Sequence, residues 1–67
     1  GQVNVRVVVD TVGRVHDARV VLSSGFSRLD EAALKAARRS TFHPYTEYGR
    51  PLFAMAIIPY RFNLNGK

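Results

Sequence analysis

The stretch from residue 20 to residue 33 constrains the fold most, because an apolar run stops in it and a helix begins. Three apolar residues, 20–22, are followed by Ser23-Ser24-Gly25, a composition typical of a turn. Ser27 then stands three residues before Asp30, which is the spacing of a capping box at a helix N-terminus. We therefore expect a strand that leads directly into a helix.

The predicted helix has an apolar face made mostly of small side chains. Residues 30–31 are acidic and fall in its first turn, and residues 38–39 are basic and fall in its last turn, as the helix dipole favours. Because the face is small, we expect the helix to lie close on a sheet, with large core side chains supplied by the strands, Phe26 and Phe42. The face consists of Leu29, Ala33, Ala36, Ala37 and Ser40.

Two strands are predicted before the helix. Valines at positions 3, 5, 7 and 9 alternate with other residues, the period-2 pattern of a half-buried strand. A turn around Gly13 leads to a second strand over residues 15–22. Val15 has the opposite parity to the remaining inward positions, so we expect a β-bulge near His16-Asp17. Those inward positions are Ala18, Val20 and Leu22.

A third strand is predicted over residues 51–64, after a polar loop at residues 45–50. Its even positions form one continuous apolar face, which we expect to be core: Leu52, Ala54, Ala56, Ile58, Tyr60, Phe62 and Leu64. The odd positions Phe53, Met55 and Ile57 are also apolar, although a helix on one face of a sheet leaves the other face open to solvent. Either another segment covers these three side chains, or they form an exposed patch that awaits a partner.

Pro59 indicates that the third strand lies at an edge of the sheet, because proline cannot donate a ladder hydrogen bond. Backbone direction alternates with period 2, as side-chain direction does. The outward backbone groups would then belong to Met55, Ile57 and Arg61, with Pro59 offering only its carbonyl. Such an edge is an incomplete but usable template for an added strand.

Composition bounds the remaining function classes. The 67 residues make one domain, residues 1–67, without Cys, and we expect no cofactor, no metal and no catalytic residue. His16 and His43 have no nucleophile in a catalytic setting and are interpreted as surface residues. The net charge of +5 permits a nucleic-acid partner, but the basic residues are scattered rather than gathered in a stripe. No apolar run is long enough to span a membrane.

Several motifs in order resemble the C-terminal domain of TonB-type energy-transducing proteins of Gram-negative bacteria. The matching positions run from Gly1 to Leu64: Gly1-x-Val3, Gly13-Arg14-Val15, Val20 with Ser23-Ser24-Gly25, Leu29-Asp30-x-Ala32-Ala33, Phe42-x-Pro44, Gly49-x-Pro51 and Pro59-x-x-Phe62-x-Leu64. The resemblance implies an α+β fold in β-β-α-β order, with a three-stranded antiparallel sheet and one helix packed on one face. It also implies a non-enzymatic periplasmic domain. A segment outside this chain would anchor it in the inner membrane and work there with ExbB and ExbD.

In this family the domain binds the TonB box of outer-membrane transporters for siderophores, haem or cobalamin. The box adds as a strand beside the last strand of the domain. Carried over by position, the partner-binding residues are Phe53, Ala54, Met55, Ala56, Ile57, Ile58, Pro59, Tyr60, Arg61 and Phe62.

The family usually has a further segment with a Tyr-Pro motif upstream of Gly1. Without that segment we expect exposed sheet edges and a homodimer of this fragment. Two alternatives remain. One is a TonB-like module for envelope assembly or signalling by self-pairing, and the other is a basic nucleic-acid-binding domain whose binding would fall steeply with salt.

Overall fold

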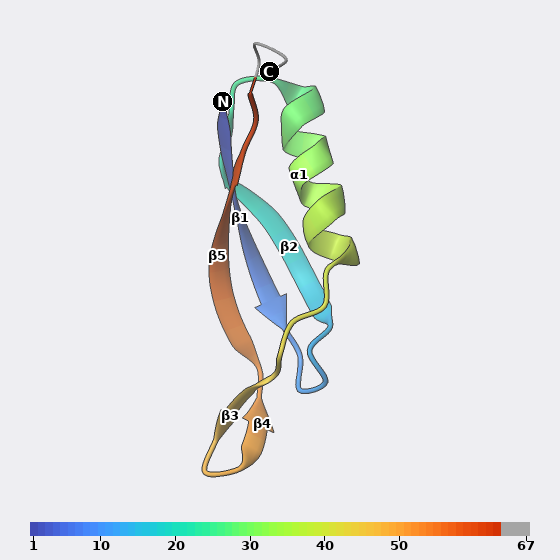
Figure 1. Ribbon diagram of the computed structural model, residues 1–67, viewed down its shortest axis with the longest axis vertical. Helices are drawn as coiled ribbons and strands as arrows, with labels where there is room; N and C mark the ends of the chain where they lie inside the picture. Colours follow the sequence, from blue (N-terminus) through green and yellow to red (C-terminus); the bar gives the residue numbers. More distant parts are fainter. Residues whose placement is uncertain (64–67) are drawn as a thin grey trace.

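A three-stranded antiparallel sheet carries one helix on one face, and a small hairpin projects from its end (Figure 1). The computed structural model describes residues 1–63. The sheet has the strand order β2-β1-β5, and β3 pairs with β4 in a separate two-stranded sheet. This confirms the predicted α+β fold and adds the hairpin to it. The elements are β1 (Gln2–Val9), β2 (Val15–Leu22), α1 (Ser27–Arg39), β3 (Tyr45–Glu47), β4 (Arg50–Leu52) and β5 (Ala54–Arg61).

The core lies between the central strand β1 and the helix. Val3, Val5 and Val7 are fully buried, and Val9 is 5% exposed, which confirms the predicted alternation of β1. Small residues of the neighbouring elements complete the core: Ala18, Ala33 and Ala37. Since the buried helix residues are alanines, the helix backbone lies close on the sheet, as the sequence predicts.

The predicted bulge in β2 is present at His16. Val8 and Val9 of β1 face residues 17 and 15 of β2, so His16 is the extra residue between them. The bulge changes the parity of the strand. Val15 and Ala18 therefore both contribute to the core, with Ala18 buried and Val15 packed beside it.

A second bulge in β2 makes one sequence prediction wrong. Val5 and Asn4 face residues 20 and 22, which leaves Val21 as an extra residue. Leu22 is therefore opposite Asn4, on the face away from the core, and is 49% exposed. The predicted inward position of Leu22 fails because the bulge shifts the alternation by one residue.

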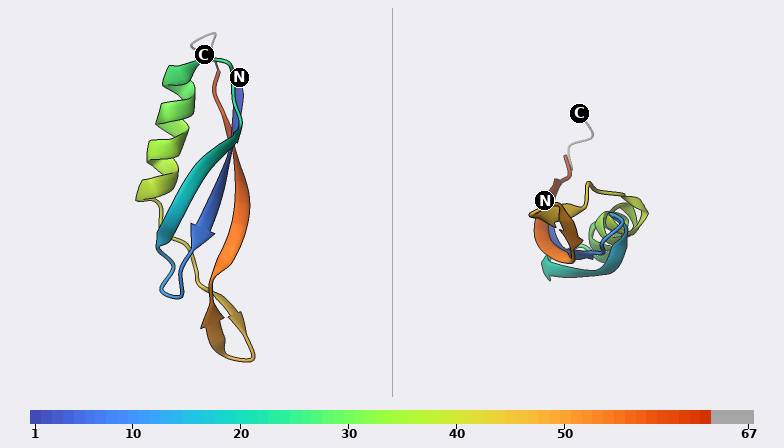
Figure 2. Two further views of the ribbon diagram at one scale, coloured as in Figure 1. Left: turned by 180° about the vertical axis from the view of Figure 1, so that it is seen from behind. Right: turned by 90° about the horizontal axis from the view of Figure 1, so that it is seen from below.

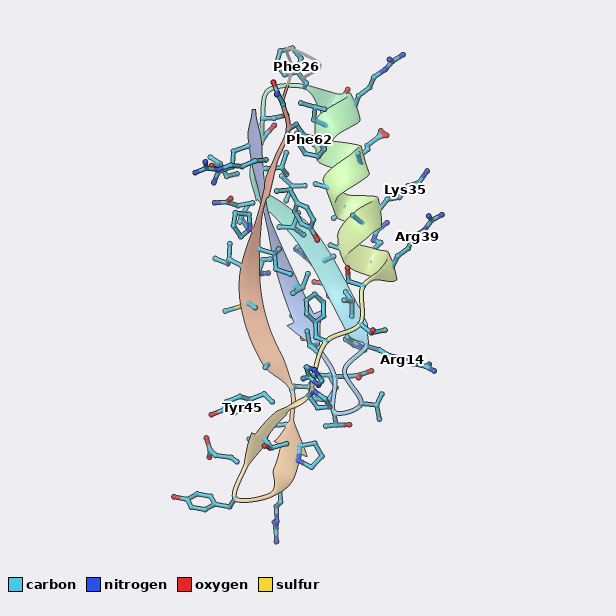
Figure 3. All side chains as sticks on the ribbon, in the orientation of Figure 1. Arg14, Phe26, Lys35, Arg39, Tyr45 and Phe62 are labelled. Atoms are coloured by element: carbon cyan, nitrogen blue, oxygen red, sulfur yellow. The ribbon has the colours of Figure 1, made fainter. Side chains whose placement is uncertain are left out.

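The helix begins and packs differently from the prediction at several positions. Phe26 is the N-cap residue, without a side-chain capping bond, so Ser27 and Asp30 form no capping box. Phe26 is 55% exposed rather than part of the core, because it lies before the first turn at the N-terminal end of the helix (Figure 3). Ala36 is exposed, whereas Leu34, which the prediction omitted, packs against the core. Figure 3 shows Lys35 and Arg39 pointing away from the sheet.

Residues 45–52 form a hairpin, not a loop followed by a long strand. Tyr48 and Gly49 have φ angles of 52° and 79°, which fits the two-residue turn of a tight hairpin. The third predicted strand is thus divided at Phe53 into β4 and β5. Leu52 is 41% exposed because it belongs to the hairpin, which extends beyond the helix (Figure 1).

The even face of β5 is only partly covered. Ile58, Tyr60 and Phe62 pack against the core, but Ala56 is exposed. The helix packs over β1 and β2 and lies away from β5, as the view from behind also shows (Figure 2). The prediction of one continuous buried face is therefore wrong for Leu52 and Ala56, and Leu64 lies outside the described residues.

Candidate functional site

Strand β5 lies at an edge of the sheet, as Pro59 predicted. It pairs with β1 on one side, and among residues 1–63 no strand pairs with its other side. The register with β1 is continuous, from Gln2 opposite Arg61 to Val9 opposite Ala54. The free side of β5 is therefore a regular strand edge rather than an irregular segment.

The hydrogen bonds at the end of this pairing fix which backbone groups face outward. Phe62 N–H donates to the carbonyl of Gly1 over 2.8 Å, and the Gly1 ammonium donates to the carbonyl of Phe62 over 3.0 Å. Gly1 and Phe62 are thus a reciprocally bonded antiparallel pair, and such pairs recur at every second residue. Even-numbered residues of β5 therefore bond to β1, and odd-numbered residues direct their backbone groups to the free edge.

The odd-numbered residues of β5 define the candidate site. Met55, Ile57 and Arg61 each present an N–H and a C=O at the free edge, and Pro59 presents a C=O alone. This is the arrangement that the sequence predicted for the backbone. An extended peptide can pair with such an edge through main-chain bonds alone, independently of most of its side chains.

Two of these residues, Met55 and Ile57, form an apolar patch with Phe53 on the face of the sheet away from the helix. Phe53, Met55 and Ile57 are 57%, 64% and 57% exposed, so within the described chain the patch is open to solvent. Met55 is opposite Val8 of β1, and Ile57 is opposite Arg6. The side chains of a strand added beside Met55 and Ile57 would therefore contact apolar neighbours.

The ten residues predicted for partner binding are not equivalent. Phe53 precedes β5 and Phe62 follows it, and the inner-face members Ala54, Ile58 and Tyr60 are partly buried. The structure thus brings the predicted residues into one strand and its ends. Within β5, the even-numbered residues bond to β1 through their backbone. The odd-numbered residues direct their backbone groups to the free edge.

One contact of the site was not anticipated from the sequence. The rings of His16 and Phe53 meet edge to face, with centroids 5.6 Å apart and planes at 90°. The bulge places His16 on β2, two strands away from β5, so no local pattern connects these residues. His16 is exposed, as predicted, but its ring also packs against Phe53 at the end of the apolar patch.

Arginines lie beside the patch on the same face of the sheet. Arg6 is opposite Arg19 of β2 as well as Ile57 of β5. Arg19 Nε lies 3.2 Å from a carboxylate oxygen of Asp17, whereas Arg6 Nε is buried and has no hydrogen-bond partner within residues 1–63. The site is therefore apolar along β5 and basic toward the middle of the sheet.

The two carboxylates with lowered pKa values, Asp10 and Asp30, stabilise turns and lie outside the candidate site. The backbone N–H of Arg14, followed by that of Val12, lowers the pKa of Asp10 at the β1–β2 turn. The hydroxyl of Ser23 and the N–H of Ser24 lower the pKa of Asp30. Asp30 accepts from Ser24 N–H over 3.0 Å and from its hydroxyl over 2.8 Å, and thereby ties the helix to the preceding turn.

Enclosed or metal-binding sites were sought in the same part of the chain. Residues 1–63 contain no pocket, and no group of three or more His, Asp or Glu side chains lies close enough to hold a metal. No helix in this range has the length and apolar character needed to cross a bilayer.

The β3–β4 hairpin is a second exposed feature that sequence reasoning missed. Tyr48 at its tip is 98% exposed and Tyr45 is 51% exposed, and Figure 3 shows Tyr45 on the projecting strand. Tyr45 Oη donates to a carboxylate oxygen of Glu47 over 3.1 Å. Gly49, which follows a polar segment, was the sequence signal for a hairpin turn. Tyr48 made that signal hard to recognise, because a Tyr rarely adopts a positive φ in such a turn.

Comparison with known proteins finds a matching family model and several relatives. A family model described as "Gram-negative bacterial TonB protein C-terminal" matches residues 1–64. The protein TonB of Neisseria gonorrhoeae is 42% identical over 67 residues, which covers 97% of this chain and 21% of that protein. The protein TonB of Neisseria meningitidis serogroup C is 40% identical with the same coverage. The chain spans about a fifth of the length of these relatives, and no solved structure matches it.

Proposed function

The chain belongs to the family of Gram-negative TonB C-terminal domains, and we propose that it is the periplasmic binding module of an energy transducer. In this proposal it is non-enzymatic and engages the TonB box of outer-membrane transporters. It thereby couples the proton-motive force of the inner membrane to the uptake of siderophores, haem or cobalamin. ExbB and ExbD would act on it through an upstream part of the transducer.

The proposed mechanism is addition of the TonB box as a strand beside β5. The observation that carries it is the row of outward backbone groups at Met55, Ile57 and Arg61 on an edge without a partner in residues 1–63. Main-chain bonds supply binding that tolerates varied partner sequences, which suits one transducer that serves several transporters. Phe53, Ile57 and Arg61 would adjust selectivity through their side chains.

This mode of binding also suits the transmission of force. Strands that slide past each other along their length must break several backbone bonds together, whereas strands peeled from one end break them one at a time. A paired strand pulled along β5 would therefore transmit force to the transporter through the whole ladder.

Calorimetric titration of the chain with a TonB-box peptide tests the proposal. We expect saturable binding that is abolished when a proline replaces the middle residue of the peptide, because proline removes a donor and disturbs the pairing. Equal affinity for both peptides would contradict strand addition. The nucleic-acid alternative predicts instead that the chain binds an oligonucleotide and that this binding falls steeply with added salt.

Pairing of β5 with a second copy is the competing use of the same edge. It is supported by the same unpartnered backbone groups and by the exposed side chains of Met55 and Ile57. A dimer that persists when the upstream segment is restored would favour the assembly or signalling alternative. Dissociation by a TonB-box peptide would favour transporter binding.

A further inference from the structure

The free edge of β5 is interrupted at one residue. Pro59 is opposite Asn4 of β1 and has odd parity, so its ring nitrogen faces the free edge. It has no N–H, and its Cδ occupies the place where a donor proton would be. Pro59 is exposed, so the ring stands where the backbone of an added strand would lie.

We propose that Pro59 ends the strand-addition site, so that a partner segment pairs with residues 54–58 and reaches no further than the carbonyl of Pro59. This inference rests on the strand addition proposed above and narrows it. Within those residues Met55 and Ile57 exchange both of their backbone bonds with the partner. Pro59 adds only its carbonyl, and Arg61 and Phe62 form no backbone bonds to the partner.

Pairing ends at Pro59 because the partner's carbonyl opposite this residue has no donor. In a regular ladder that carbonyl would accept from residue 59, but here it meets a carbon atom and finds no donor. A polar group left unpaired beside the apolar patch is unfavourable, so the partner chain turns into solvent at this point. The partner that fits is a short extended segment without proline at the two paired positions.

Pro59 also discriminates against a second copy of this chain. Two β5 strands paired antiparallel about Ile57 would set Pro59 of each copy against Met55 of the other. The missing donor then occurs at both ends of the ladder, whereas a proline-free peptide meets it at one end only. Proline on an edge strand is a known means of limiting edge-to-edge association.

Amide hydrogen exchange on the ¹⁵N-labelled 67-residue chain, with and without a saturating TonB-box peptide, tests this inference. We expect exchange to slow about tenfold or more at Met55 and Ile57, and less than about twofold at Arg61, because only newly bonded amides gain protection. Protection at Arg61 equal to that at Ile57 would overturn the inference while leaving strand addition intact. No protection anywhere in β5 would overturn both.

The variant Pro59→Val restores the missing donor on an exposed edge position where valine suits a strand. We expect protection to extend to residues 59 and 61, and the dissociation constant to fall about fivefold for one added backbone bond. Pro51→Val is the matched control, because Pro51 is also exposed but lies in β4. The same gain in both variants, or none in Pro59→Val, would overturn the assignment.

Discussion

Gly13 holds the end of the helix connection against the β1–β2 turn, and its replacement by alanine should destabilise the domain severely. Gly13 has a φ of 88°, and a Cβ built on it would lie 2.0 Å from the carbonyl oxygen of Phe42. The same residues are joined by a hydrogen bond, from Phe42 N–H to the carbonyl of Gly13, over 2.8 Å. A methyl group therefore cannot enter unless two backbone segments separate.

The expected magnitude follows from two contributions. Placing alanine at positive φ costs about 1–2 kcal/mol. Separating the segments sacrifices the Phe42–Gly13 hydrogen bond, which contributes about 1 kcal/mol, and loosens the packing of Phe42 on the core. The free energy of unfolding should thus fall by about 2–4 kcal/mol, most of the roughly 3–5 kcal/mol available to a domain of this size.

Urea denaturation followed by circular dichroism measures this effect, with Gly25→Ala as the control. Gly25 has a φ of 90°, but a Cβ there would meet nothing within 4 Å, so only the conformational cost of about 1–2 kcal/mol applies. We expect Gly13→Ala to lack a folded baseline while Gly25→Ala retains one. Equal transitions in the two variants would refute the reasoning from the close approach of Phe42.

Three further predictions concern the acid stability, the core and the edge. The pKa of Asp30 lies below its ordinary value of 3.8, so its stabilising contribution is complete above that pH and is lost as the pH falls through the lower folded pKa. Asp30→Asn should therefore flatten the decline of urea midpoints below about pH 4, and an unchanged decline would contradict a stabilising role for the hydrogen bonds from Ser23 and Ser24 to Asp30. Val5→Ala should lower the free energy of unfolding by about 2 kcal/mol, and Val12→Ala, at a 70% exposed site, by less than about 0.5 kcal/mol in the same assay. Pro59→Val should increase self-association in analytical ultracentrifugation, and a variant that stays monomeric over the same concentrations as the parent chain would count against the blocking role of Pro59.

Local periodicity was sufficient to predict the features that depend on one strand at a time. The valines of β1 are buried as their alternation indicated, and the change of parity at Val15 located the bulge at His16. The edge position of β5 followed from the missing donor of Pro59. Each of these predictions needed only the residues of one strand, because side-chain alternation and the missing N–H of a proline are local properties of the chain.

Features that depend on contacts between distant segments were not predictable in this way. The carboxylate of Asp30 binds Ser23 and Ser24 rather than Ser27, because the turn folds back over the first turn of the helix. A run of apolar residues cannot show that the helix lies away from β5 and leaves Ala56 exposed. The contact of His16 with Phe53 requires the bulge, the strand order and the end of β5 together.

The central claim is that the free edge of β5 binds an extended peptide, and an NMR titration tests it most directly. The ¹⁵N-labelled chain would be titrated with a TonB-box peptide at two protein concentrations, so that self-pairing is recognised by its dependence on concentration. The account predicts that amide shifts are largest at Met55 and Ile57 and small on the outer surface of α1 around Lys35. Shifts centred on α1 or on the β3–β4 hairpin, with β5 unchanged, would contradict it.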